Sequence, residues 1–276
     1  MANNTINLSA GVRNNLLSLQ RTSSLIGVAQ TRLSTGLKVN SALDNASAFF
    51  TSKALTNRAN DLEGLKSDIE LAINTIEAGI NGIDGITELV EQAKGLANNA
   101  KATGDTSEQS SLAAQFDELL NQINDLSNDS SFNGTNLIQA TPDDLDVDFN
   151  EAGTSDLTIT GLDSSTGANG LNIAASTNDF GDAAAITTAL TELNSALVTL
   201  RSNAATLGSN NTVLQTRLSF TDDLVGTLED GAGNLTLADL NEESANLLAL
   251  QTREQLGINS LSLAAQSERS ILALFG

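Results

Sequence analysis

A seven-residue repeat of apolar side chains constrains the fold of this 276-residue chain more than any other feature. In its strictest stretch the repeat passes, at a constant step of seven, through Leu62, Ile69, Ile76, Ile83, Val90 and Ala97. A continuous helix of about 40 residues, roughly 60 Å long, places all of these on one stripe. The sequence holds a single proline, so little interrupts long helices. The repeat therefore predicts a mainly α-helical protein built around narrow apolar seams.

Three further segments carry the same spacing. The N-terminal one has apolar residues at Val12, Leu16, Leu19, Ile26, Leu33 and Leu37. A third segment follows alternating steps of four and three between residues 193 and 218, with Asn211 as its polar interruption. The C-terminal one has apolar residues at Leu247, Leu250, Leu261, Ala264 and Ile271. A narrow seam is buried only against another helix, so we expect long antiparallel helices in coiled-coil bundles, with the N- and C-terminal helices paired and the two middle segments paired.

Both chain ends carry apolar residues on more than one helix face. Sequence neighbours such as Leu16 and Leu17, or Leu247 and Leu248, point about 100° apart around a helix, and one partner helix cannot cover both directions. We expect the ends of an isolated copy to fray, because a two-helix contact scarcely offsets the entropy of ordering them. Contacts between unlike surfaces of successive copies generate a helical filament unless their rotation closes a ring. The pattern therefore predicts a polymerisation interface that contains Val12, Leu16, Leu19, Ile26, Leu33, Leu247, Leu250, Leu261, Ala264 and Ile271.

The middle of the chain breaks the helical pattern. Pro142 ends the helical regime, and glycines separate two strand-like pieces, Leu157–Thr160 and Leu171–Ile173. We expect a small β-hairpin region over residues 141–182, which is too short to form an independent domain of any size.

Alternating acids before this region allow two interpretations. Asp144, Asp146 and Asp148 alternate like the ligands of an EF-hand calcium loop. However, Phe149 and Ser155 stand where such a loop needs glycine and glutamate. We therefore favour a solvated acidic face over a calcium site.

Composition excludes several classes of function. The net charge of −21 argues against nucleic-acid binding. Histidine and cysteine are absent, which removes imidazole bases, thiolate nucleophiles and the usual zinc ligands, so we expect no enzyme and no cofactor. The start of the chain lacks a Sec-type signal peptide, and no apolar run approaches 18 residues, so we expect no membrane insertion. Residues 102–200 hold sixteen acids and no lysine or arginine, and we interpret them as a solvated outer face.

Three motifs carry a resemblance to a known family. Arg32–Ser41, read as Arg-Leu-Ser-Thr-Gly-Leu-Lys-Val-Asn-Ser, and the following Ala42–Ala46 resemble the N-terminal signature of bacterial flagellins. Ser131–Ile138 is similar to their Phe-Asn-Gly turn, and Asp239–Leu247 with Leu256–Ile258 is similar to their C-terminal signature. The motifs occur in the order and spacing of the family, so together they are far more specific than any one alone.

The resemblance implies a domain organisation. Residues 1–40 and 240–276 would form an inner coiled-coil domain. Residues 41–140 and 183–239 would form an outer helical rod, and residues 141–182 a small β-rich excursion of that rod. A spoke between the two shells would contain Arg32, Leu37, Asn40 and Asp44.

The resemblance also implies a function. The chain would be a structural subunit that polymerises into the helical flagellar filament used for swimming. It would be secreted through the type III export apparatus and would meet itself and sister flagellins, the filament cap, the hook-filament junction protein and an export chaperone. Two alternatives remain, namely a hook-filament junction protein and a coiled-coil adaptor that forms no polymer. The metalloprotease inserted in some flagellins is excluded here, because its metal-binding motif requires histidine.

One segment departs from the family. Many flagellins carry an arginine-rich stretch that serves both filament contacts and an innate immune receptor. The corresponding residues here include Glu91, Gln92, Lys94 and Leu96, and the arginines are missing. Bidentate pairing with carboxylates is lost with them, so we expect weak or absent recognition by that receptor.

Overall fold

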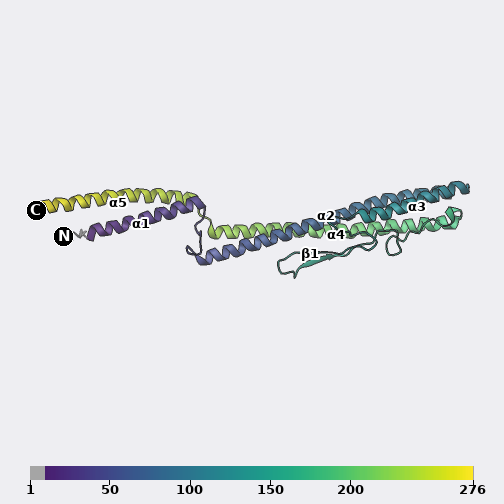
Figure 1. Cartoon of the computed structure of the whole chain (residues 1–276), viewed down its shortest axis with the longest axis horizontal. Coiled ribbons are helices and arrows are strands. Elements are labelled where there is room, and N and C mark those ends of the chain that lie inside the picture. Colours follow the sequence, from purple (N-terminus) through teal and green to yellow (C-terminus); the bar gives the residue numbers. More distant parts are fainter. Residues whose placement is uncertain (1–9, 276) are drawn as a thin grey trace, which may run out of the picture. The chain divides into compact units, whose positions relative to one another are not determined.

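The computed structural model describes residues 10–275, except for the side chains of residues 268 and 271–275. Its elements (Figure 1) are α1 (Ala10–Thr35), α2 (Ala46–Ala102), α3 (Thr106–Asp129), β1 (Leu145–Asp148), β2 (Asp156–Ile159), the 3-10 turn η1 (Asn178–Phe180), α4 (Ala183–Thr236) and α5 (Leu240–Phe275). The predicted mainly α-helical class with a small β-hairpin is confirmed. The chain divides into a terminal unit, residues 1–57 with 228–276, and a middle unit, residues 58–227.

The core of the middle unit is built from helical seams. The strict repeat of α2 supplies Ile69, Ile76, Ile83 and Val90, all fully buried, and α4 supplies Leu193, Leu200, Leu207 and Leu214. A Cβ atom added to Gly79 of α2 would lie 3.3 Å from Cδ1 of Leu207, so glycine lets the two helices approach closely. The predicted pairing of the two middle segments is confirmed.

Helix α3 is a third contributor that the sequence analysis did not separate from its neighbours. It begins where Gly104 interrupts the helix and Asp105 caps the next one, its carboxylate accepting a hydrogen bond from the Ser107 amide at 2.8 Å. Its buried residues recur in steps of three and four, namely Ala113, Phe116, Leu120, Ile123 and Ser127. The middle unit is therefore a three-helix arrangement in which α3 runs along α2 and α4 (Figure 1) and contributes to the same buried core.

The β region follows the prediction in part. Strands β1 and β2 form an antiparallel hairpin in which Leu145 faces Ile159 and Val147 faces Leu157. The predicted strand at 157–160 is thus found one residue earlier, whereas β1 was not predicted. The strand predicted at Leu171–Ile173 is wrong. Its two apolar residues alternate because both are buried, but the amide of Leu171 donates to the Ser165 carbonyl oxygen at 2.8 Å within an irregular loop, and no strand pairs with it.

Helix α4 is the one described helix that is long and apolar enough, by length and composition, to cross a membrane. The core helix of a water-soluble protein meets the same criterion. Part of this apolar content belongs to the core, because Leu193, Leu200, Leu207 and Leu214 of α4 are fully buried.

The terminal unit is built on the pairing of α1 with α5, which run side by side in Figure 1. Ile26 and Ala29 of α1 and Leu250 of α5 form its small core, with Leu247 packed against it. Gly257 of α5 lies against Leu19, since an added Cβ would come within 3.0 Å of that leucine. The predicted pairing of the N- and C-terminal helices is confirmed.

Two linkers, one after α1 and one before α5, lie side by side at one end of this helix pair. Helix α1 ends at Thr35, and the φ of 73° at the following Gly36 lies in the left-handed region that favours glycine. The amide of Lys38 donates to the Thr236 carbonyl oxygen at 2.8 Å, and the amide of Ala238 donates to the Gly36 carbonyl oxygen at 2.9 Å. These bonds hold the end of α4 beside the chain that leaves α1.

Candidate self-assembly surface

The predicted interface residues are largely used inside the terminal unit. Val12, Ile26 and Leu250 are buried, and Leu16 is exposed. The half-buried ones are Leu19, Leu33, Leu247, Leu261 and Ala264. The side chain of Ile271 lies outside the described residues. The seam therefore mainly joins α1 to α5 of the same chain, and most of its apolar area is already covered before a second copy arrives.

A different set of apolar residues stays uncovered in the terminal unit. On α1 these are Leu17, Leu25 and Val28, which are all exposed. On α5 they are Leu248, Leu256, Ile258 and Leu263, which are also exposed. Contiguous exposed apolar side chains of this size mark interaction sites more often than isolated ones do. The apolar side chains on the additional helix faces are thus the ones that another copy could contact.

The rows on the two helices follow helical spacing. Leu17, Leu25 and Val28 lie eight and three residues apart, which keeps them on one face of α1. Leu248, Leu256 and Leu263 lie eight and seven residues apart, which gives α5 a comparable outward row. We call these the α1 row and the α5 row. Each row could bury its leucines against a helix of a neighbouring copy, and each fully buried leucine contributes about 1.5–3 kcal/mol.

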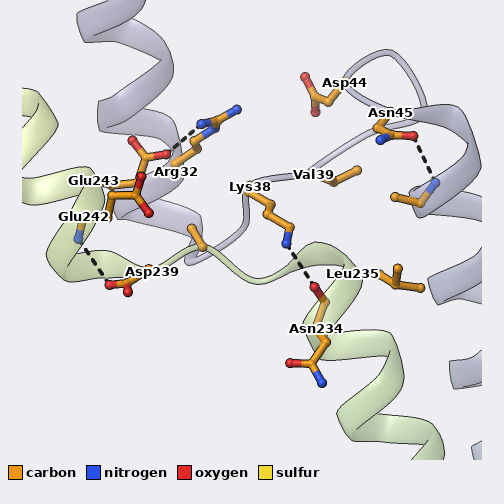
Figure 2. Close-up of a pocket in the computed structure, with 12 residues that line it drawn as sticks. Arg32, Lys38, Val39, Asp44, Asn45, Asn234, Leu235, Asp239, Glu242 and Glu243 are labelled. Atoms are coloured by element: carbon orange, nitrogen blue, oxygen red, sulfur yellow. Dashed lines mark hydrogen bonds and ion pairs between the residues drawn. The ribbon is translucent and has the colours of Figure 1, made fainter.

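A cleft lies at the base of the same unit (Figure 2). It has a volume of about 640 Å³ and is lined by residues of α1, α2, α4, α5 and the two linkers, among them Arg32, Lys38, Asp44, Asp239, Glu242 and Glu243. Nη1 of Arg32 donates to Oε1 of Glu243 at 2.6 Å, and Nζ of Lys38 donates to the Asn234 carbonyl oxygen at 3.0 Å. The ion pair joins α1 to the first turn of α5.

Glu243 stands out within the cleft. The residue is only 9% exposed, and its Oε2 has no hydrogen-bond partner among the described residues. A buried carboxylate is stable only when its charge is compensated, and Arg32 reaches one of its two oxygens. The pair therefore holds the two helices together while the second carboxylate oxygen remains unsatisfied.

The predicted spoke residues fall in or beside this cleft. Arg32 and Asp44 line it, Leu37 forms a bridge with Leu237, and Asn40 is exposed. Oδ2 of Asp44 accepts hydrogen bonds from the amides of Asn40 at 3.0 Å and Ser41 at 2.9 Å. These two amides, the Asn40 amide first, lower the pKa of Asp44 below its usual value. The carboxylate thus fixes the turn that leads from α1 into α2.

Sequence reasoning missed four of the charged residues that line the cleft, namely Lys38, Asp239, Glu242 and Glu243. Glu243 belongs to the C-terminal motif, and Lys38 belongs to the N-terminal motif, but nothing in either motif indicates which residues meet across the 211 positions that separate Arg32 from Glu243. Acids in the first turn of a helix, such as Glu242 and Glu243, are ordinarily explained by the helix dipole alone.

The segment that departs from the family lies on the middle unit. Glu91 and Gln92 are exposed on α2, and Lys94 and Leu96 are half-buried. Gln92 and Leu96 also line a groove of about 520 Å³ together with Glu118 of α3. Lys94 makes none of the ion pairs found among the described residues.

The alternating acids show no calcium-loop geometry. Asp146 and Asp148 lie in β1, and Oδ1 of Asp144 accepts a hydrogen bond from the Gly161 amide at 2.9 Å. Over the part of the chain that the structure describes, no group of three or more acidic side chains could hold a metal ion.

Comparison with known proteins decides the family. Residues 6–142 match the bacterial flagellin N-terminal helical region. Flagellin FljO of Caulobacter vibrioides is 36% identical to this chain over 276 residues, which is the full length of both proteins. The chain belongs to the bacterial flagellin family. Flagellin FljM of the same organism is 35% identical over the full length of both chains, and the flagellin of Brucella melitensis is 32% identical over 94% of this chain and 95% of its own.

Membership settles the main function. This flagellin is a structural subunit of the bacterial flagellar filament, and its family is one of structural proteins. Neither the junction protein nor the non-polymerising adaptor is favoured, because the relatives named flagellin match it from end to end.

Proposed function

We propose that copies of this flagellin polymerise chiefly through the outward rows of the paired terminal helices. The observation that carries the proposal is the exposure of leucines on both rows, beside a seam that is already filled within one chain. Burial of these rows in the filament drives association at roughly 25 cal/mol per Å² of apolar surface removed from water. The entropy of ordering and associating the subunits opposes it.

The seam residues have a supporting role in this proposal. Val12, Leu16, Leu19, Ile26 and Leu33 align α1, and Leu247, Leu250, Leu261, Ala264 and Ile271 align α5, so that each row faces outward. Residues 1–40 and 240–276 would form the inner shell. Residues 41–140 and 183–239, with a β-rich excursion at 141–182, would form the outer rod, and the shells would be connected by Arg32, Leu37, Asn40 and Asp44.

The full-length chain offers a direct test. Purified protein should show a critical concentration below which no polymer forms, and sonicated filament fragments should seed growth above it. Electron microscopy should reveal long filaments. A discrete oligomer of constant size at every concentration would overturn the proposal, since that is the behaviour of a closed assembly.

Assembly should also order the chain ends. Amides of α1 and α5 should exchange with solvent rapidly in the isolated subunit and slowly in the filament, because a lone helix pair is only marginally stable. Hydrogen exchange measured by mass spectrometry on both forms checks this. Equal protection in both forms would contradict the mechanism.

The remaining partners complete the proposal. We infer export through the flagellar type III apparatus to the extracellular filament, with a chaperone before export, the hook-filament junction protein at the base and the cap at the growing end. Sister flagellins would share the same polymer. The proposal assigns no catalytic residue and no cofactor to the chain.

The altered receptor segment supports a separate prediction. Glu91, Gln92, Lys94 and Leu96 place one cation where many flagellins have several, so the bidentate contacts of arginine are missing. We expect little response in a reporter-cell assay for the flagellin receptor. A full response at ordinary concentrations would contradict this.

A further inference from the structure

Negative charge is in excess in the cleft at the base of the terminal unit. Asp44, Asp239, Glu242 and Glu243 line it against two cations, Arg32 and Lys38. Arg32 is engaged with Glu243, and Lys38 donates to a backbone carbonyl oxygen. The cleft also contains the nine-tenths buried Glu243 with its unpartnered Oε2 (Figure 2). It therefore favours an additional cationic group.

Such a group is displayed elsewhere on the same unit. Arg21 lies four residues after Leu17 and four before Leu25, so it stands in the middle of the α1 row. It is exposed and makes no ion pair among the described residues. The described part of α1 contains no acidic residue at all, so nothing on its own helix neutralises Arg21. An arginine framed by apolar side chains is a frequent centre of protein interfaces.

The surroundings of the cleft match the surroundings of Arg21. Leu237 and Leu240 flank Asp239 in sequence and are exposed, and Leu43, next to Asp44, is 98% exposed. These exposed leucines are close in sequence to Asp44 and Asp239, which line the cleft, just as Leu17, Leu25 and Val28 are close in sequence to Arg21. The two surfaces are therefore complementary in both charge and apolar character.

We propose that the α1 row of one copy docks on the cleft of a second copy, with the Arg21 guanidinium among the cleft carboxylates. The inference rests on the proposed polymerisation and names one of its contacts. Because the two surfaces differ, the contact is heterologous, and in the proposed filament it repeats from copy to copy. Glu242 is the first partner for the guanidinium, since its side chain is exposed at the cleft, and the excess charge around Glu243 adds attraction.

Charge reversal tests the contact in the full-length protein. Arg21→Glu and Glu242→Arg should each raise the critical concentration about tenfold or more. A mixture of the two variants should polymerise near the wild-type critical concentration, because each defective surface then meets its complement. The double variant Arg21→Glu/Glu242→Arg should recover in the same way. Raising the salt concentration should shrink the defect of each single variant.

Controls separate this contact from polymerisation in general. Arg201→Glu reverses an exposed cation of the middle unit and should leave the critical concentration unchanged. Circular dichroism should give the same helix content for every variant, because the altered side chains are exposed. If the wild-type chain forms filaments and Arg21→Glu has the same critical concentration as the wild type, the contact is overturned and the proposed function is not. Failure of the mixture and the double variant to recover would also overturn it, whereas failure of the wild-type chain to polymerise would overturn the proposed function.

Discussion

The middle and terminal units differ in how much of their apolar surface is buried within one chain. In the middle unit, apolar residues of three helices and the hairpin share one continuous core. In the terminal unit, the described cluster of buried residues between α1 and α5 consists of Ile26, Ala29 and Leu250, and leucines of both helices stay exposed. A unit with a continuous core is stable alone, whereas a two-helix contact leaves apolar surface that only further copies can cover.

The two units also differ in net charge. Six basic and twenty-six acidic residues give the middle unit a net charge of −20, and seven basic and eight acidic residues give the terminal unit −1. Copies of the middle unit repel one another, while copies of the terminal unit do not. Apolar attraction and electrostatic repulsion therefore belong to different parts of one chain, which suits a polymer whose subunits must stay soluble until they join it.

Truncation of the C-terminal helix should have the largest effect on assembly. Removal of residues 247–276 should abolish polymerisation, because α1 then loses its partner and the α5 row disappears. The middle unit should remain folded, since its core contains no residue beyond 214 among its buried members. Negative-stain electron microscopy and a cooperative thermal transition by circular dichroism check the two halves of this prediction. Normal filaments from the truncated chain would refute the assignment of assembly to the terminal unit.

A pair of exposed positions sharpens the assignment. Leu256 of the α5 row is 65% exposed and Val198 of α4 is 63% exposed, so aspartate at either should leave an isolated subunit folded. In the filament, Leu256→Asp buries a charge and should prevent assembly at concentrations where the wild type polymerises, at a cost of several kcal/mol per subunit.

Val198→Asp is the matched control and should polymerise normally. Sedimentation of polymer at a series of protein concentrations measures both. Equal defects in the two variants would mean that the middle unit contributes as much to assembly as the terminal unit does.

Substitutions at two glycines test whether packing within the middle unit determines its stability. A Cβ at Gly82 would come within 2.6 Å of Ile138 Cδ1 and 2.2 Å of Ser130 Oγ, so Gly82→Ala should lower the free energy of unfolding by about 1–3 kcal/mol. Nothing lies within 4 Å of a Cβ at Gly208, so Gly208→Ala should raise it by about 0.5–1 kcal/mol through helix propensity.

Denaturant unfolding of the isolated subunit measures both changes. The sign should be opposite in the two variants, and their critical concentrations should differ far less than their stabilities. An equal destabilisation by both alanines would show that the space around the two positions does not decide the outcome.

The smallest expected effect concerns the hairpin of the middle unit. Nε of Arg58 donates to Oε1 of Glu151 at 2.8 Å, and the pKa of Glu151 is lowered first by a backbone hydrogen bond of its own residue and then by Arg58. A lowered pKa means that this contact stabilises above the ordinary pKa of glutamate and is lost as pH falls through the folded pKa.

Arg58→Met should raise the Glu151 pKa and remove part of this acid sensitivity. Arg58 is largely exposed, so the change in stability should stay below about 1 kcal/mol. The pH dependence of the Glu151 carboxyl carbon shift, followed by NMR, measures the pKa directly. An unchanged value in the variant would show that the backbone hydrogen bond alone lowers it.

Helix pairing was predictable because seams are local patterns. The step of seven from Leu62 to Ala97 and the repeat from Val12 to Leu33 fix which face of each helix is apolar, and a narrow face has few ways to be covered. The irregular region was predicted less well. Leu171 and Ile173 alternate like a strand, yet loop hydrogen bonds take up their backbone, whereas the short Leu145–Asp148 strand exists because β2 pairs with it.

The helical class, the pairing of the two ends and, through the motifs, the family could all be predicted from the amino-acid sequence. Each of these depends on periodicity or on contiguous residues. Two properties became visible in the folded chain alone. One is which terminal leucines are covered within one chain and which stay exposed. The other is the contact of Arg32 with Glu243 in a cleft with excess negative charge. These properties depend on the rotation of α1 against α5 and on contacts across more than two hundred residues, and a one-dimensional pattern encodes neither.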